Sequence, residues 1–368
     1  MHGKYILKRI SISLIVLFIV ITLNFFLPRL MFSDPASPYY VGIPDDAYEL
    51  RHLIRVEYGF DQPIFIQYLK YLHRIFTLNF GSSHIYKMPV FDVMFRRIPW
   101  SLVLSLTSMA ISVFLGIIFG SLAAKKRGKW QDKALLKLST VSTAIPTFWL
   151  ALILVLVFGF MLPIFPYHGA MTSGYILKFN DLVFLIVNLI FILATIILYR
   201  VFKKTSFAII LLITGFMLSI LFAVSFFDII DIAYHSILPL IAICFGSTIG
   251  YSLMVRNMMI VTVNEDYILA ARAKGLSERR VIFRHAFKNA LLPLVTRLGM
   301  SIAGLLGGSV LIERIFSWPG MGQLLLEANN NGDFQLAQAI MLFFAIITIF
   351  SNLFIDIIYH KLDPRVSI

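Results

Sequence analysis

The chain has 368 residues, of which 59% are hydrophobic and only 14% are charged, and its mean hydropathy is +0.86. Soluble domains carry about 25% charged residues, so this composition predicts a polytopic, all-α membrane protein. The formal net charge of +13 lies mostly in short segments between apolar runs, as membrane topology requires. This placement argues against nucleic acid as a partner.

Sequence signatures of catalysis and of metal binding do not occur in the chain. Cys244 is the single cysteine, which excludes an internal disulfide and a Cys-based metal site. There is no GxxxxGK[ST] loop to cradle nucleotide phosphates and no GxSxG nucleophile elbow. We therefore predict that the chain is not an enzyme and that it binds no metal and no cofactor itself.

Eight apolar runs are long enough to cross a bilayer as helices, because a span needs about 20 mostly apolar residues. They lie near residues 10–32, 100–124, 134–162, 181–200, 206–227, 236–256, 292–313 and 335–358. The first run follows Lys4, Lys8 and Arg9 but is too long for a signal peptide and lacks an A-x-A-like cleavage site. It is predicted to be a retained helix.

The distribution of Lys and Arg predicts the orientation of these spans. With the N-terminus inside, the inner segments are residues 1–9, 125–137, 200–205, 256–291 and 359–368. They hold 21 of the 32 Lys and Arg residues. Because positive charge gathers on the cytoplasmic side, both termini are predicted to be cytoplasmic.

This topology divides the chain into four parts. Residues 1–32 form an N-terminal transmembrane helix, residues 33–99 an extracytoplasmic region, residues 100–358 the main transmembrane domain, and residues 359–368 a cytoplasmic tail. In the extracytoplasmic region, one amphipathic helix is predicted before Gly59 and a second after Pro63. Packing on the ends of the spans is favoured for them over lying on the membrane surface.

The inner segment 256–291 contains most of a basic stretch, "LAARAKGLSERRVIFRHAFKNALLP" (Leu269 to Pro293). Its first part predicts a short helix with alanines close together, which lets another surface approach the backbone. Gly275 suits the left-handed conformation that ends a helix, and Ser277 can cap a second one. In that second helix Arg280 and Arg284 belong to a basic stripe.

Two interpretations of this stretch compete. It is either a solvated loop whose basic stripe meets anionic lipid, or a docking surface for a cytoplasmic partner. The small residues before Gly275 favour docking.

Two GxxxG pairs lie in the apolar runs, Gly116 with Gly120 and Gly304 with Gly308. Small residues at this spacing predict close helix packing within the bundle.

Several segments in chain order resemble the membrane subunits of ABC importers of the dipeptide, oligopeptide and nickel group. They are "YGFDQPIFIQYLKYL" from Tyr58, "LNFGSS" from Leu78, "RRIPWSL" from Arg96, "ARAKGL" from Ala271, "ALLP" from Ala290, "ERIFSWPGMG" from Glu313 and "LDPR" from Leu362. The chain departs from the general importer motif at Leu269, where the motif has glutamate, and in a longer spacing from Gly275 to the proline. Residues 169–235 replace a short outer connection and predict an inserted helix pair.

The resemblance implies a type I ABC importer fold of about eight spans, six of them family-like. This chain would be a permease subunit for di- or oligopeptides in the inner membrane of a prokaryote. Its partners would be a second homologous permease, two ABC ATPases that carry ATP and Mg, an extracytoplasmic solute-binding protein and membrane lipid. The resemblance assigns ATPase coupling to Ala270, Ala271, Arg272, Ala273, Lys274, Gly275, Leu276, Arg280 and Arg284, and an outer turn to Ser317, Trp318, Pro319 and Gly320.

Some alternatives stay open at the level of sequence. Trp318 is either an interfacial anchor or part of a gate or docking surface in the outer turn. An ion-coupled secondary transporter of a small solute is the alternative function, although such a protein is expected to show internal repeats and buried ionisable residues. A membrane scaffold without transport is a third. The sequence does not select the substrate among dipeptides, oligopeptides, nickel and other chelates.

Overall fold

The computed structural model describes residues 2–31, 47–172, 226–277 and 309–362, together with isolated positions between these ranges. The chain divides into two units. The first consists of residues 1–97, 296–308 and 321–368, and the second of residues 98–295 and 309–320.

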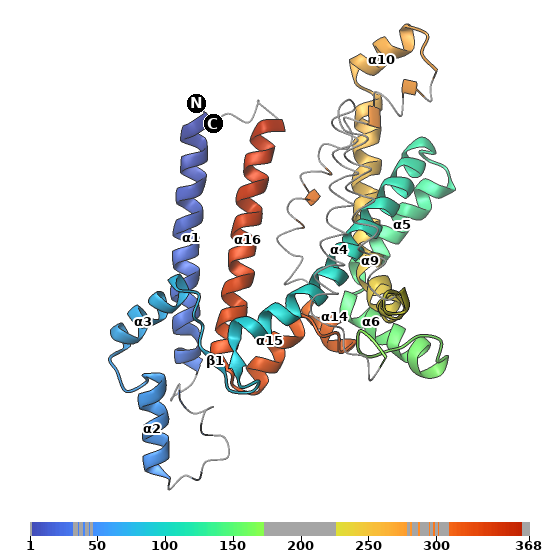
Figure 1. The fold of residues 1–368 in the computed structure, drawn as a ribbon. Helices are drawn as coiled ribbons and strands as arrows, with labels where there is room; N and C mark the ends of the chain where they lie inside the picture. Colours follow the sequence, from blue (N-terminus) through green and yellow to red (C-terminus); the bar gives the residue numbers. More distant parts are fainter. Residues whose placement is uncertain are drawn as a thin grey trace. The chain divides into compact units, whose positions relative to one another are not determined.

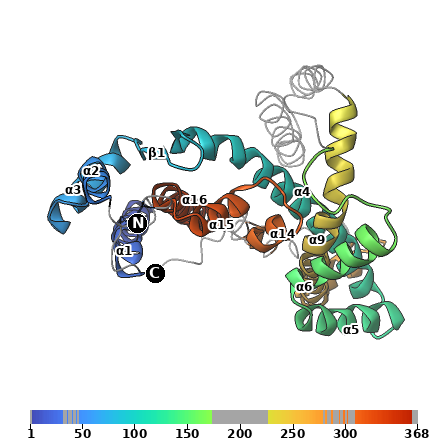
Figure 2. The same ribbon diagram turned by 90° about the horizontal axis from the view of Figure 1, so that it is seen from below.

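The first unit is built on a pair of long helices, α1 (His2–Met31) and α16 (Phe334–Leu362), which lie side by side in Figure 1 and Figure 2. A reciprocal amide pair joins them. The Asn24 side chain donates to the Gln338 carbonyl at 2.8 Å, and the Gln338 side chain donates to the Asn24 carbonyl at 2.8 Å. Because a buried amide needs partners, this pair fixes the two helices in register.

The predicted amphipathic helices are confirmed as α2 (Tyr48–Tyr58) and α3 (Ile64–Phe76). Gly59 ends α2 with φ 72°, and Pro63 precedes α3. The α3 helix packs on α1 through Tyr68, whose hydroxyl lies 2.8 Å from the Thr22 hydroxyl, and through Tyr71, whose hydroxyl accepts from Asn24 at 3.1 Å. Burial raises the pKa of Tyr71 to about 12.

A two-stranded hairpin, β1 (Ser82–Ser83) and β2 (Met88–Pro89), pairs antiparallel with Ser82 opposite Pro89. It lies against the start of α16, which follows α15 (Met321–Asn330). The buried Asp333 carboxylate accepts from the Ser83 hydroxyl at 2.5 Å and from the Leu336 backbone N–H at 3.1 Å. One carboxylate therefore caps α16 and holds the hairpin.

The second unit contains the remaining helices, and α4 enters it from the first unit at Ile98. They are α4 (Val90–Lys125), α5 (Trp130–Ala144), α6 (Thr147–Leu154) continued by the π-helical turn η2 (Val155–Met161), α9 (Phe226–Val263), α10 (Asp266–Ala273) and α14 (Val310–Ile315). The α9 helix packs against α5, α6 and α14. A buried cluster at this junction contains Leu104, Leu238, Phe316 and Trp318.

Four described helices are long and apolar enough to cross a membrane. Their candidate spans are Leu7–Phe26, Val90–Lys125, Ile230–Val263 and Phe334–Leu353. The predicted run 134–162 differs from a straight helix. Here α5 and α6–η2 meet at a bend of 93° and together make a possible fifth span. Pro146 is the cause, because the residue before a proline avoids helical angles and Ile145 is accordingly extended.

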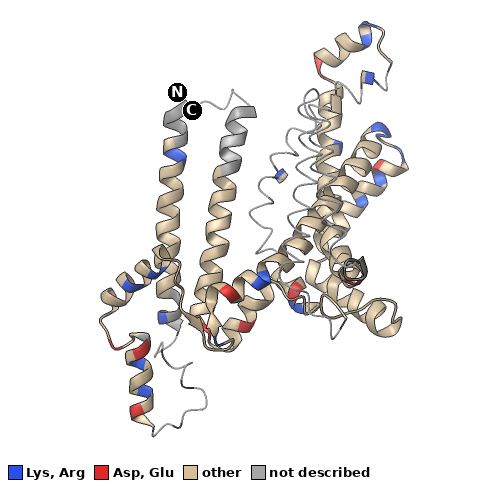
Figure 3. Ribbon diagram, in the orientation of Figure 1, with Lys and Arg blue, Asp and Glu red and all other residues tan. Residues whose placement is uncertain are grey.

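Charged residues lie at helix ends, in α2 and α3, and at the start of α5 (Figure 3). This is the pattern that a bilayer imposes on spanning helices. The predicted runs 181–200, 206–227 and 292–313 lie wholly or mostly outside the described residues, as does most of the predicted insertion 169–235.

Candidate functional site

The α10 helix begins directly after α9 at a tight turn. The Asn264 side chain donates to the Ile260 carbonyl at 3.0 Å, and Glu265 is extended, with φ −73° and ψ 147°, as the residue that precedes α10. The Ile268 N–H then bonds to the Glu265 carbonyl at 2.9 Å. These contacts place α10 at the end of α9, as Figure 1 shows.

The α10 helix has a buried face and an exposed face. Ile268 and Ala271 are buried, 0% and 7% exposed, and pack with Val281 and Ala286. Ala270 and Ala273 are exposed. The small-residue surface expected here is therefore narrower than the sequence indicates. Ala271 belongs to the interior of the segment, because a helix turns it to the same side as Ile268.

Gly275 ends this short helix in the left-handed conformation that the sequence predicts, with φ +73°. The Lys274 N–H bonds to the Ala270 carbonyl at 3.1 Å, and the Gly275 N–H bonds to the Arg272 carbonyl at 2.9 Å. A Cβ atom placed on Gly275 would meet no atom within 4 Å. The glycine is thus required by the backbone angle, and its exposed side is open to another surface.

The second predicted helix is described only at Arg280, Val281, Ala286 and Phe287. The N–H groups of Arg280 and Val281 bond to the Ser277 carbonyl at 2.8 Å and 3.0 Å, so the chain turns back into helix at Ser277. Arg280 is exposed. Arg284 lies outside the described residues, and the basic stripe stays a prediction.

An ion pair joins α9, the helix that precedes α10, to α5. Arg256 of α9 donates from Nε and Nη2 to the two oxygens of Asp132 in α5, at 2.7 Å and 3.0 Å. The same carboxylate accepts from the Gly128 N–H at 2.8 Å and is 3% exposed. A two-point guanidinium contact fixes orientation as well as distance.

The Ser317–Gly320 turn is held within the second unit by its backbone and by one indole. Ser317 has a left-handed φ of 49°, and the Phe316 carbonyl accepts from the Gly169 N–H at 2.8 Å. The Trp318 N–H bonds to the Glu313 carbonyl at 2.8 Å. Its indole donates to the Trp100 carbonyl at 2.9 Å and meets the Trp100 ring edge to face.

Trp318 is fully buried, so its interpretation as an interfacial anchor is wrong. An anchor would present its ring to the boundary between lipid and water, whereas this ring fills the cluster with Phe316 and Leu104. Ser317 is exposed and Pro319 is half-buried. Any partner of this turn would therefore contact its backbone rim and Ser317 in place of the indole.

A buried carboxylate that sequence reasoning missed lies under the turn. Glu313 is 0% exposed and accepts from the Ser101 and Ser309 hydroxyls at 2.8 Å and 2.9 Å. A Cβ atom on Gly320 would collide with the Glu313 carboxylate and lie 2.5 Å from the Ser101 hydroxyl. The signal was present in the sequence, since Glu313 opens the "ERIFSWPGMG" segment, but the pattern alone does not indicate burial.

The structure places Gly116 and Gly120 of α4 against α9. A Cβ atom on Gly116 would lie 2.5 Å from Tyr251 Cβ, and one on Gly120 would lie 2.8 Å from Val255 Cβ. The close approach supports their predicted packing role. Gly304 and Gly308 lie outside the described residues, so the packing predicted for them is not described.

The predicted coupling segment around α10 and the predicted outer turn Ser317–Gly320 do not form one site. Figure 1 places α10 and α14, which precedes the Ser317–Gly320 turn, at opposite ends of the second unit. In the part of the chain that the structure describes, no cluster of His, Cys, Asp and Glu side chains could hold a metal ion. The short helix α10 therefore lies at one end of α9, and the buried Ser317–Gly320 turn packs near the other.

Two family models match the chain. The model described as the inner membrane component of binding-protein-dependent transport systems matches residues 116–368. The model of the N-terminal part of such membrane components matches residues 2–107. Together they cover nearly the whole chain.

Named relatives match over their full length. The chain is 32% identical over 366 residues to the dipeptide transport system permease protein of Lactococcus lactis subsp. cremoris, with 99% of both chains covered. It is 30% identical over 366 residues to an oligopeptide transport system permease protein of Bacillus subtilis, again with 99% of both covered. A di/tripeptide transport system permease protein of Pseudomonas aeruginosa is 32% identical over 367 residues, with 99% of this chain and 98% of the relative covered.

These matches confirm the resemblance that the sequence motifs indicated, and they agree with the helical fold and the spanning helices. The chain therefore belongs to the inner membrane components of binding-protein-dependent transport systems, the permease components of ABC importers.

Proposed function

We propose that this chain is a peptide permease subunit that works with a second, homologous permease, two cytoplasmic ABC ATPases and an extracytoplasmic solute-binding protein. Di- and oligopeptides are the proposed substrates, since relatives along the whole chain are named for dipeptide, di/tripeptide and oligopeptide transport. In this proposal ATP and Mg bind to the ATPases, and this chain supplies the path and the coupling.

One observation carries the proposal: the exposed, small-residue edge of α10 at the end of a long helix. Ala270, Ala273 and Gly275 are exposed, and Gly275 has open space on the side where a Cβ would lie. Small side chains let a partner approach the backbone closely. An ATPase docked on this edge would act on α10 and, through the tight Glu265 turn, on α9.

Movement of α10 would be passed on because α9 is tied to its neighbours. The bidentate contact between Arg256 and Asp132 joins α9 to α5, and the glycines of α4 bring that helix against α9. A group of helices held in this way moves as one body. Alternating access then follows from rigid-body rocking driven by the nucleotide state of the ATPases.

The proposed orientation puts α10, the α4–α5 connection and both termini in the cytoplasm. It is supported by the excess of Lys and Arg in the inner segments of the predicted topology. The Ser317–Gly320 turn would then face the binding protein.

The test is purification of the tagged chain in mild detergent, with the co-purifying proteins identified and quantified. Two ATPase copies and one second permease per chain are expected. The reconstituted complex should import a labelled dipeptide only with ATP and the binding protein present. Isolation of the chain alone after crosslinking in membranes, or uptake that survives ATP depletion while an ion gradient persists, would contradict the proposal.

A further inference from the structure

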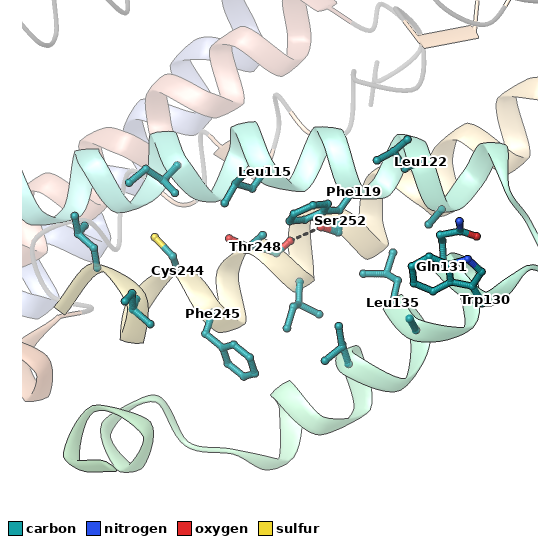
Figure 4. A pocket seen from close by; sticks show the side chains of 17 residues that line it. Leu115, Phe119, Leu122, Trp130, Gln131, Leu135, Cys244, Phe245, Thr248 and Ser252 are labelled. Carbon is teal, nitrogen blue, oxygen red and sulfur yellow. Dashed lines mark hydrogen bonds between the residues drawn. The ribbon is translucent and has the colours of Figure 1, made fainter. Parts of the chain in front are cut away.

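A long apolar groove runs between α4, α5 and α9 in the second unit (Figure 4). Its volume is about 690 Å³. Leu115 and Phe119 of α4 line one side, Leu135 and Leu138 of α5 another, and Phe245 of α9 a third, within a lining that is almost wholly apolar. Several of these side chains are open to the surroundings, among them Phe119 at 48% and Leu138 at 47% exposure.

The groove has the length of one leaflet of a bilayer. It follows α4 from Ile111 to Leu122, and a helix rises about 1.5 Å per residue, so this distance is about 17 Å. Half of a hydrocarbon core about 30 Å thick is about 15 Å. The groove is therefore about as long as one leaflet is thick.

The end of the groove near Leu122 has a polar mouth. Trp130 is 74% exposed there, as expected of an indole at a membrane interface. With the Gln131 amide oriented to accept, its oxygen lies 2.9 Å from Trp130 Nε1 and 2.8 Å from Lys126 Nζ. Trp130 and Gln131 thus place polar groups at the end of the groove where a lipid head group would lie, whereas Thr248 and Ser252 of α9 line it further along.

The connection at this mouth is strongly basic. The connection and the adjoining helix ends, residues 125–137, carry Lys125, Lys126, Arg127, Lys129, Lys133 and Lys137. The one carboxylate among them, Asp132, is buried and already paired with Arg256. It therefore does little to offset the positive field at the surface, and the mouth is complementary to an anion.

We infer that this groove is a binding site for an anionic phospholipid of the inner leaflet. The acyl chain lies along α4, α5 and α9, and the phosphate lies among the lysines of the α4–α5 connection. Basic pockets between membrane helices on the cytoplasmic side are a known way of holding anionic head groups. The inference rests on the orientation given in the proposed function, which puts this end of the groove in the cytoplasm.

A peptide substrate fits the groove less well than a lipid. Each residue of a peptide brings a backbone N–H and a carbonyl, and burying these without hydrogen bonds costs several kcal/mol. The lining offers hydrocarbon along most of its length. An acyl chain needs nothing else.

The test uses the reconstituted transporter in nanodiscs that contain phosphatidylglycerol or phosphatidylcholine with a photoreactive diazirine on the acyl chain. Adducts are mapped by mass spectrometry after illumination. We expect adducts on the groove segments of α4, α5 and α9, with phosphatidylglycerol labelling more than phosphatidylcholine. Replacing Lys126 and Lys129 by Gln should reduce that preference by about fivefold for each lysine removed. The paired outer substitutions Lys70→Gln and Lys87→Gln should leave it unchanged.

A steric pair of variants separates the groove from the general lipid annulus. Leu115→Trp fills the groove and should abolish the adducts there, whereas Ile118→Trp, which adds the same bulk elsewhere on α4, should not. Equal labelling by both lipids at the groove, or a groove crosslinked to the second permease and unlabelled by lipid, would overturn the inference. Lipid labelling requires no transport, so the peptide assignment can fail while the lipid site stands.

Discussion

Asp132 and Arg256 form a bidentate ion pair that uses both carboxylate oxygens, at 2.7 Å and 3.0 Å, and links α5 to α9. Both partners are largely withdrawn from solvent, with side-chain exposures of 4% for Asp132 and 16% for Arg256. A pair of this kind contributes little over a well-packed apolar pair, but the loss of one partner leaves a buried charge.

Breaking this pair should destabilise the second unit. We expect Arg256→Met to lower the free energy of unfolding by about 3 kcal/mol, because the Asp132 charge stays buried without its guanidinium. The double variant Arg256→Met with Asp132→Leu should recover much of that loss. Thermal unfolding in detergent measures both. The exposed neighbour variant Lys133→Gln is the control and should change little, and equal stability of the single and double variants would refute the argument.

Two substitutions at Gly275 should distinguish its role in the backbone conformation from a role in docking a partner. Gly275→Asn keeps access to left-handed angles, so its folded chain should be nearly as stable as the original, whereas Gly275→Val costs about 1–2 kcal/mol of strain. If a partner approaches this glycine closely, both variants should lose ATP-driven uptake. The measurement is peptide import per ATP hydrolysed in proteoliposomes, and full coupling with Asn at this position would show that no close approach occurs.

Substitution by Leu should affect stability at Ala271 and ATPase binding at Ala273. Ala271→Leu overpacks the cluster with Ile268 and Val281 and should cost about 1–3 kcal/mol of stability. Ala273 is exposed, so Ala273→Leu should leave stability unchanged while it weakens ATPase binding. Unfolding temperature and ATPase co-purification, measured on both variants, check the two effects. A destabilised Ala273→Leu with intact ATPase binding would reverse the assignment of the faces.

Gly320→Ala should be harmful because the added Cβ collides with the Glu313 carboxylate. We expect a loss of about 1–3 kcal/mol in the free energy of unfolding. Gly246→Ala is the matched control, since a Cβ there meets nothing within 4 Å and a helix gains up to about 1 kcal/mol from the change. Thermal unfolding of the two variants should therefore shift in opposite directions.

Local sequence rules predicted the elements whose signals are local. Gly59 and Gly275 end their helices at left-handed angles, and Pro63 precedes α3, because conformation at these positions depends on the residue itself. The length of the apolar runs predicted α1 and α16, and this signal is also independent of distant contacts. A bilayer requires about 20 apolar residues whatever the rest of the chain does.

What depended on distant packing was not predicted. The 93° bend in the run 134–162 is a separate miss, because its cause, Pro146, is local and visible in the sequence. The burial of Trp318 and Glu313 depends on residues that are remote in sequence, Trp100 and Ser101. A tryptophan at the end of an apolar run and a tryptophan in a core look the same in sequence. Only the contacts distinguish them.

The amide pair between Asn24 and Gln338 constrains the order in which the protein can be made. These residues are 314 positions apart, one in the first helix of the chain and the other in the last. Synthesis proceeds from the N-terminus, so α1 is present in the membrane long before its partner helix exists. Its buried amide must meanwhile rely on other groups, such as Tyr71 of α3. The first unit is therefore completed last, and a chain that stops short of α16 leaves its opening helix without the neighbour that secures it.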